Sequence, residues 1–256
     1  MTGAAAIPFA AFGVAGCLRI GARLLMMLIL LIICVPMHYL WRLARLPNPW
    51  PRMFLAGVGS AAGMKIRVVG QRQRRGAFLL ANHVSWLDIP AIARANGSAF
   101  VAQDGLAAVP VLRWLCALND TVFIARHDRA SVAEQVVKVR EALRDTGALT
   151  IFPETTTSDG SGLLPFKSSL LSAIDPVPEG IAVVPVVLAY GPESAEIAWI
   201  GVEPGRDNFL RILARSRPIH LTVRFLAPLS GAALANRKTM SAAARSAILD
   251  ALQQLD

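Results

Sequence analysis

The hydrophobic pattern divides the chain into two parts. Near the N-terminus, Leu24–Trp41 is an uncharged apolar run of about 18 residues, close to the shortest helix that spans a bilayer. Residues 4–17 are also apolar but rich in Ala and Gly. The two runs are equally consistent with one transmembrane span or with a helical hairpin that dips into one leaflet. No small-residue cleavage site follows the long run, which argues against a cleaved signal peptide.

From about residue 65 the pattern changes to short apolar, β-branched runs separated by segments of helical length. Ser131 and Glu134 form a capping-box pattern that predicts a helix ending at Gly147. Helical connections between apolar strands predict an α/β fold, a mostly buried mixed sheet flanked by helices. The predicted strands are Lys65–Val69, Ala77–Ala81, Ala99–Ala102, Thr121–Ala125, Leu149–Phe152, Ile181–Ala189, Ile197–Val202 and Ile219–Phe225.

The charge is concentrated where the apolar bulk is. Residues 1–87 contain ten Lys or Arg and no acid, whereas the other 16 bases face all 17 acids, giving a net charge of +9. Unopposed cations beside an apolar helix predict an anionic membrane lipid surface as partner; an Arg-rich genome is the alternative source of the charge. No zinc-finger or RNP-type motif supports nucleic-acid binding. Because Arg19 and Arg23 precede the apolar run and Arg42 and Arg45 follow it, the positive-inside rule does not orient it.

A basic segment near residue 210 and the three cysteines also bear on function. Gly205–Arg217 interleaves apolar and Arg residues, which fits either a basic amphipathic helix on the membrane or an ordinary helix packed on the core. Cys17, Cys34 and Cys116 lie far apart and form no CxxC pair, so neither a disulfide framework nor a metal site is expected.

The candidate chemistry begins at His83, directly after an apolar strand, with Asp88 five residues later. On one continuous helix the two side chains would point about 140° apart. If the strand ends at His83 and a helix starts near Ser85, Asp88 can fold back onto the imidazole. The carboxylate then fixes the tautomer and leaves the other ring nitrogen as a general base. Alternatively, Ser85 and Asp88 form a capping box and His83 is incidental.

Four ordered blocks accompany this pair. They are Asn82-His83-x4-Asp88, Thr-Val-Phe-Ile-Ala-Arg126, Ile-Phe-Pro-Glu154-Thr155 with the downstream Leu-Pro-Phe-Lys167, and Val-Val-Pro185-Val. Over residues 65–227 these blocks resemble the glycerolipid acyltransferase family, whose members include lysophosphatidate acyltransferase. The chain lacks the G-x-S-x-G elbow of lipase-type hydrolases, so the nucleophile would be a substrate hydroxyl.

The resemblance implies roles for these residues. His83 would deprotonate the hydroxyl of a lysolipid acceptor, which attacks the thioester of acyl-CoA or acyl carrier protein, and Asp88 would orient His83. The resemblance associates Arg126 and Glu154 with the headgroup of the acceptor, and Lys167 is a further candidate for an anionic group. The remaining candidate substrate-binding residues are Asn82, Ser85 and Thr155. No cofactor and no metal are expected.

The chain departs from the family pattern in three places, one of which is the Gly of the second block, replaced near Asn119-Asp120. Thr155 replaces the usual Gly after Phe-Pro-Glu, and Thr157 replaces the usual Arg. Loss of a cation weakens the prediction of a phosphate headgroup, and the sequence looks closer to the branch that acylates lyso-ornithine lipid. Lysophosphatidate and lyso-ornithine lipid therefore both stay open as acceptors.

These inferences give a domain division and a location. Residues 1–50 are expected to anchor the protein in the membrane, and residues 51–256 to form the acyltransferase domain. The resemblance implies a bacterial inner membrane with the catalytic domain facing the cytoplasm. The alternative function is a catalytically silent lipid-binding or scaffold protein on the same fold.

Overall fold

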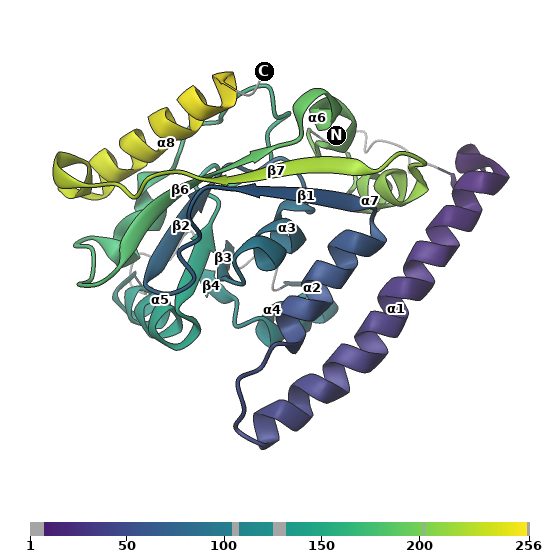
Figure 1. Ribbon diagram of the computed structural model, residues 1–256, viewed down its shortest axis with the longest axis horizontal. Helices are drawn as coiled ribbons and strands as arrows, with labels where there is room; N and C mark the ends of the chain where they lie inside the picture. Colours follow the sequence, from purple (N-terminus) through teal and green to yellow (C-terminus); the bar gives the residue numbers. More distant parts are fainter. Residues whose placement is uncertain (1–7, 104–107, 125–131, 202, 255–256) are drawn as a thin grey trace.

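A seven-stranded sheet forms the centre of the computed structural model, which describes residues 8–103, 108–124, 132–201 and 203–254 (Figure 1). The strand order is β1-β7-β6-β2-β5-β3-β4. All neighbours run parallel except β6 and β7, which are antiparallel, so the predicted mixed sheet is confirmed. The strands are β1 Met64–Val69, β2 Ala77–Ala81, β3 Ala99–Gln103, β4 Val122–Ile124, β5 Ala148–Ile151, β6 Ala182–Ala189 and β7 Ile219–Phe225.

Helices cover both faces of the sheet. The α-helices are α1 Gly13–Leu43, α2 Trp50–Ala61, α3 Asp88–Ala95, α4 Pro110–Leu118, α5 Val132–Thr146, α6 Ser194–Ile197, α7 Gly205–Ala214 and α8 Arg237–Gln253. Short 3-10 helices are η1 Phe9–Phe12, η3 Ser168–Ile174, η4 Gly191–Glu193 and η5 Gly231–Leu234. Gly147 follows α5 with a φ of +81°, the left-handed conformation that ends many helices, as its position predicted. Ser131, the proposed cap of α5, lies outside the described residues.

The central strands are apolar on both faces because helices bury both sides. Along β2, Leu79 and Ala81 point to the cluster that contains Ile92 of α3 and Ile212 of α7. The alternate residue Phe78 points to the cluster that contains Val139 of α5 and Met240 of α8. All five residues of β2 are buried, which explains why the strand reads as a continuous apolar run.

The predicted strand at Ile197–Val202 is wrong over residues 197–201; Val202 lies outside the described residues. Ile197 ends the short helix α6, and the next three residues form no regular element. The backbone N–H of Trp199 instead donates to the carbonyl of Val84, beside the candidate site, and Gly201 turns the chain with a φ of +65°. The apolar pattern here reflects burial at a loop rather than a strand.

The N-terminal apolar residues form one long helix rather than two separate runs. α1 continues through Pro36 to Leu43, so Gly13 to Cys17 of the first run belong to the same helix as Leu24–Trp41. α1 packs against α2 and, near its amino end, against α7. Among the described residues it is the one helix long and apolar enough to cross a membrane, and 11% of its most apolar stretch is buried.

α7 behaves as an ordinary packed helix. Ile212 and Leu213 are fully buried, and the α7 residue Arg211 pairs with Glu203. Arg215, which follows the helix, pairs with Glu193 at 2.6 Å. Because its cations are neutralised and its apolar side faces the core, the structure favours core packing over the membrane alternative for this segment.

Candidate active site

The turn between β2 and α3 brings His83 and Asp88 together. The Nδ1 atom of His83 lies 2.8 Å from Oδ2 of Asp88. β2 ends at Ala81. The sequence predicted that the next helix starts near Ser85, but α3 begins at Asp88. The residues between them form a tight turn because their backbone N–H groups bind the same carboxylate.

Asp88 is fully buried and accepts hydrogen bonds from four donors. Oδ2 accepts from His83 and from the backbone N–H groups of Val84 at 2.7 Å and Ser85 at 2.9 Å. Oδ1 accepts from the hydroxyl of Tyr190 at 2.6 Å. A buried carboxylate with this many donors is held in one orientation. Burial, and then the neighbouring charge of Asp88, raise the pKa of Tyr190 well above its usual value, so the phenol keeps its proton.

The capping alternative for Ser85 and Asp88 describes part of the geometry. The carboxylate of Asp88 does accept the N–H of Ser85, as in a capping box, but it accepts from the imidazole of His83 on the same oxygen. Ser85 is fully buried, and its hydroxyl lies 3.5 Å from the backbone N of Leu87. Ser85 therefore contributes to the turn that holds the two side chains together.

The imidazole of His83 stacks on a phenyl ring. The ring of Phe152 lies 4.1 Å from it, centre to centre, with 19° between the planes. Phe152 in turn stacks on Phe100 at 6.3 Å. The side chain of His83 remains 19% exposed, while Asp88 is not exposed. Nδ1 is thus directed at Asp88, while the side chain as a whole keeps some contact with solvent.

Glu154 binds the backbone with both carboxylate oxygens. Oε1 accepts the N–H of His83 at 2.8 Å, and Oε2 accepts the N–H of Leu164 at 2.8 Å. The side chain is 2% exposed. Burial raises the pKa of Glu154 to about 7, although these two hydrogen bonds act to lower it. Each oxygen thus accepts a hydrogen bond from the protein, and the headgroup contact that the resemblance implied stays a prediction.

Asn82 also binds backbone. Its amide nitrogen donates to the carbonyl of Leu188 at 2.9 Å, and its amide oxygen accepts the N–H of the same residue at 2.7 Å. The side chain is buried. Asn82 therefore continues the pairing of β2 with β6 by one residue and fixes the point at which the chain turns toward His83.

The remaining candidate substrate-binding residues differ in their surroundings. Thr155 has a φ of +67°, the left-handed conformation in which glycine is favoured, which gives a physical reason for the usual Gly at this position. The hydroxyl of Thr157 donates to the carbonyl of Trp199, so this side chain is directed into the protein. Lys167 is exposed at the start of η3, and its backbone N–H donates to the carbonyl of Pro153. Arg126 lies outside the described residues.

Sequence reasoning missed two residues of this site. Tyr190 follows β6 directly, and the backbone N–H of Ser158 donates to the carbonyl of His83 at 2.7 Å. A polar aromatic residue at the end of an otherwise apolar strand was the available signal for Tyr190. Ser158 carried no signal, because its contact is 75 residues away along the chain.

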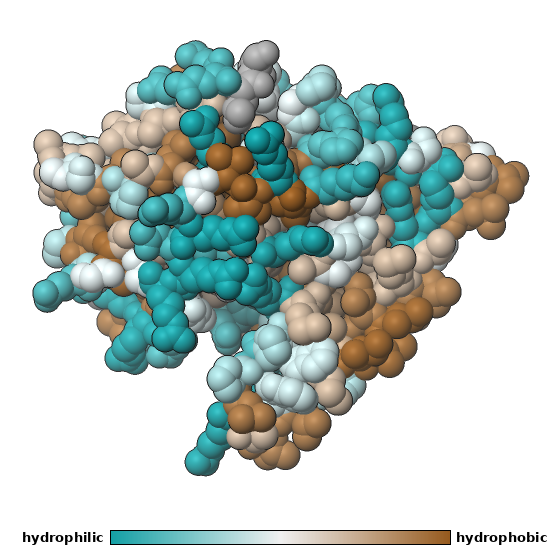
Figure 2. Space-filling model, viewed as in Figure 1, coloured by the Kyte–Doolittle hydropathy of each residue, from teal (hydrophilic) through white to brown (hydrophobic). Residues whose placement is uncertain are grey.

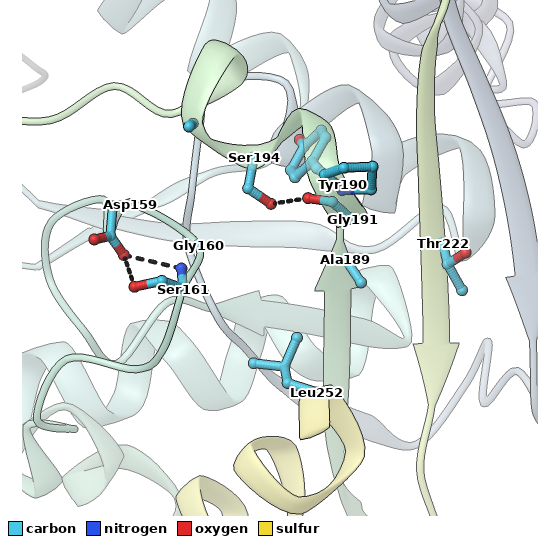
Figure 3. Close-up of a pocket in the computed structure, with 11 residues that line it drawn as sticks. Asp159, Gly160, Ser161, Ala189, Tyr190, Gly191, Ser194, Thr222 and Leu252 are labelled. Atoms are coloured by element: carbon cyan, nitrogen blue, oxygen red, sulfur yellow. Dashed lines mark hydrogen bonds between the residues drawn. The ribbon is translucent and has the colours of Figure 1, made fainter. Parts of the chain in front are cut away.

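A cavity of about 480 Å³ lies behind the pair. Figure 3 shows it between the loop Asp159–Ser161, the residues after β6 and the end of α8. Tyr190 lines this cavity and donates to Asp88, whereas His83 is not among the lining residues. The hydrogen bonds with Ser161 lower the pKa of Asp159 at its rim.

Comparison with known proteins identifies the family. The family model described as Acyltransferase matches residues 65–189. A lyso-ornithine lipid O-acyltransferase from Rhodobacter capsulatus is 30% identical over 201 residues, 75% of this chain and 71% of that protein. This chain belongs to the acyltransferase family. The predicted resemblance is therefore confirmed.

Other relatives differ in the acceptor that their names give. A lyso-ornithine lipid O-acyltransferase from Rhizobium meliloti is 35% identical over 174 residues, 65% of this chain and 59% of that protein, so less than two thirds of its length is matched. A 1-acyl-sn-glycerol-3-phosphate acyltransferase from Neisseria gonorrhoeae is 37% identical over 135 residues, 52% of each chain. The names of these relatives give two different lysolipid acceptors.

A solved structure has the same fold. The 1-acyl-sn-glycerophosphate acyltransferase PlsC from Thermotoga maritima superposes with a TM-score of 0.61 at 19% identity. The alignment covers 93% of this chain and 97% of that one. The shared fold therefore includes the N-terminal helices as well as the sheet.

Proposed function

We propose that this protein transfers a fatty acyl group from an acyl thioester to the free hydroxyl of a lysolipid, with His83 as general base. The observation that supports this most directly is the 2.8 Å contact between His83 Nδ1 and Asp88, a carboxylate already held by three other donors. A proton on Nδ1 then donates to Asp88, and Nε2 is left as the basic atom.

The reaction follows from that tautomer. Nε2 takes the proton of the acceptor hydroxyl as its oxygen bonds to the thioester carbonyl carbon. The carbon–sulfur bond then breaks, and the departing thiolate takes the proton back from the imidazolium. The products are an ester and a free thiol, and the imidazole returns to its starting state. Asp88 stabilises the imidazolium during the intermediate step without accepting its proton.

We assign Glu154 to positioning. It accepts the backbone N–H of His83, while the backbone N–H of Ser158 donates to the carbonyl of the same residue, so both peptide groups of the base are fixed by the loop that follows β5. Phe152, from the same segment, holds the ring. A base fixed at backbone and ring keeps its attack geometry when a lipid arrives, which is where orientation contributes most. Asn82 and Ser85 position the turn in the same way.

Lyso-ornithine lipid is the acceptor that we favour. The usual Arg of the third block is Thr157, and its hydroxyl is bonded to the carbonyl of Trp199. This position therefore offers no cation to a phosphate. The relatives from Rhizobium meliloti and Rhodobacter capsulatus carry lyso-ornithine lipid in their names.

The second candidate acceptor is 1-acyl-sn-glycerol-3-phosphate, because the Neisseria gonorrhoeae relative is 37% identical over the matched block. For either acceptor, Arg126 and the exposed Lys167 are the proposed contacts to anionic groups, since a guanidinium or ammonium binds carboxylate and phosphate alike. Acyl-CoA or acyl carrier protein is the proposed donor.

We further propose that α1 anchors the protein on an anionic membrane, with residues 1–50 as the anchor and 51–256 as the catalytic domain. Figure 2 shows an apolar surface along α1. α1 is packed on α7 at its amino end and on α2 further along, so one side of it is covered by protein. This arrangement favours insertion of the uncovered side into one leaflet over a full span. The proposed location is the bacterial inner membrane, with the catalytic domain on the cytoplasmic side.

The test is an acyl-transfer assay of purified protein. Lyso-ornithine lipid and 1-acyl-sn-glycerol-3-phosphate are offered side by side, each with acyl-CoA and with acyl carrier protein as donor. We expect transfer to lyso-ornithine lipid to be faster, and His83→Ala to lower kcat at least a thousandfold. His220→Ala, in an exposed histidine of β7, is the matched control and should leave kcat unchanged. Near-wild-type transfer by His83→Ala would refute the mechanism.

A further inference from the structure

Among the residues that the structure describes, α4 carries a group of exposed apolar side chains on one side. It has the sequence PVLRWLCAL, with one charge, and none of its nine residues is buried. Val111, Leu112 and Trp114 are exposed, as is Val109 just before the helix. Soluble proteins seldom leave a contiguous apolar surface of this kind uncovered, and such surfaces mark sites of contact with proteins or membranes.

The carboxyl end of α1 lies beside this helix. The indole N–H of Trp114 donates to the hydroxyl of Tyr39 at 3.2 Å. Burial raises the pKa of Asp120, which lies just after α4, and the charges of His38 and Arg42 in α1 lower it. The carboxyl end of α4 therefore lies near the carboxyl end of α1. Tyr39, Leu40 and Leu43 of α1 are also exposed. We name the combined surface the α1–α4 patch; it consists of Tyr39, Leu40, Leu43, Val111, Leu112 and Trp114.

The charges around the patch indicate its partner. Arg113 of α4 and Arg42 and Arg45 at the end of α1 are exposed. No acid occurs in α1 or α4. Apolar side chains with Tyr and Trp among them and cations at the border are the composition of a surface that lies in the headgroup region of an anionic bilayer.

We propose that α4 is a second membrane contact, continuous with α1, and that the α1–α4 patch rests in the interface of an anionic bilayer. The proposal rests on the anchoring of α1 proposed above. Two contacts that are far apart in sequence fix the tilt of the domain, because one helix alone allows rotation about its own axis. The tilt determines how far the turn that carries His83 lies from the headgroups.

Depth-dependent quenching tests this proposal in the full chain. Cys17, Cys34 and Cys116 are replaced by Ala, and a single cysteine carrying a nitrobenzoxadiazole dye is placed at Leu112, at Ile32 of α1 or at Ser246 of α8. Ile32 and Ser246 are exposed, and serve as positive and negative controls. Each labelled protein must retain acyl transfer to acceptor in detergent micelles, which shows that it is folded.

The proteins are bound to vesicles of phosphatidylglycerol and phosphatidylcholine with spin-labelled acyl chains. We expect the dyes at positions 112 and 32 to be quenched at least twofold and the dye at 246 to be unaffected. Quenching at 32 with none at 112 overturns the α4 contact and leaves the α1 anchor standing. Quenching at neither position overturns both. If the fluorescence of the dye at position 112 changes only when acyl carrier protein is added, and not on binding to vesicles, the membrane assignment is overturned in favour of a protein contact.

A variant pair measures the consequence for catalysis. Leu112→Glu adds a negative charge to the patch and should lower transfer to vesicle-embedded acceptor about tenfold, with transfer in micelles unchanged. Val137→Glu makes the same change at an exposed position of α5 and should lower neither. Equal activities of the Leu112→Glu and Val137→Glu proteins on vesicles would overturn the proposal.

Discussion

At the scale of single residues, the site is built from groups that bind the backbone as well as each other. Asp88 holds the imidazole of His83 and two N–H groups of the same turn. Glu154, in the turn after β5, accepts the N–H of His83. The same carboxylate atoms therefore stabilise the fold and position His83. Loss of either carboxylate should lower both the stability and the rate.

Thr155 provides a prediction about strain. A β-branched residue at a φ of +67° is held in a conformation that costs about 1–3 kcal/mol, whereas glycine adopts it freely. Glycine also loses more chain entropy on folding, which offsets about 0.5–1 kcal/mol of the gain. We expect Thr155→Gly to raise the free energy of unfolding by about 1 kcal/mol, measured by urea denaturation in detergent. A destabilised variant would show that contacts of the threonine side chain outweigh the strain.

Glu154 provides a prediction about pH. Its folded pKa of about 7 lies above the ordinary value of 4.5, so the folded protein keeps a proton that the unfolded chain releases. This stabilising contribution is complete below pH 4.5 and is lost as the pH rises to about 7. Its upper limit is roughly 3 to 4 kcal/mol, at about 1.4 kcal/mol for each pKa unit.

The non-titrating variant Glu154→Gln should therefore lose less stability than the wild type between pH 5 and 7. Glu154→Gln should also lower kcat. The amide NH2 of glutamine is a donor, so it would face one of the two backbone N–H groups that the carboxylate accepts. Glu179→Gln, at an exposed position, is the control. Parallel stability profiles for wild type and Glu154→Gln would contradict the assignment.

At the scale of elements, basic residues at the start of α1 dock this helix on the catalytic domain. Nε of Arg19 donates to the carbonyl of Ala214 at 2.8 Å, and Arg23 donates to the carbonyls of Ile212 and Leu213. These carbonyls end α7, where the helix dipole favours a cation. Two of the cations that the sequence associated with lipid are thus engaged in packing α1 on α7.

The turn after β1 supplies a prediction for the sheet. Gly70 has a φ of +85°, and a Cβ there would lie 2.1 Å from the carbonyl oxygen of Phe225 at the end of β7. Gly70→Ala should therefore lower the free energy of unfolding by more than about 2 kcal/mol. Gly231→Ala is the matched control, because its φ of +55° brings the same strain without any atom within 4 Å. Equal losses in denaturation midpoint for the two variants would show that the close contact relaxes.

At the scale of the whole molecule, the exposed side of α1 is available to the membrane while its other side is part of the core. Ile20 is fully buried, whereas Ile29, Ile32 and Ile33 are exposed. Truncation of the helix would uncover the core, so substitution on the exposed side separates anchoring from folding.

We expect Ile29→Asn, Ile32→Asn and Ile33→Asn together to release most of the protein from membranes in carbonate extraction, because transfer of each polar amide into lipid is unfavourable. The released protein should keep its activity on micellar acceptor. Deletion of residues 1–46 should also abolish retention, but with loss of solubility. Full retention of the triple variant would contradict anchoring by this side of α1.

The sequence by itself determined the strands that carry continuous apolar runs, and the fold class with them. β2 and β7 were predicted with the observed ends, because burial on fixed faces leaves a direct record in residue type. The pairing of His83 with Asp88 was also predictable, since both lie on one short turn. The family followed from local motifs in a fixed order.

Only the tertiary structure decided what depends on contacts between distant segments. Ile197–Val202 has the apolar pattern of a strand, yet Trp199 binds the turn of His83, more than a hundred residues away in sequence. Glu154 accepts two backbone N–H groups, and its motif did not predict them, because a carboxylate in a motif looks the same whether it faces substrate or backbone. The pattern along a chain shows that a residue is buried or charged. Which partner meets it depends on how the elements pack, and that information is not local.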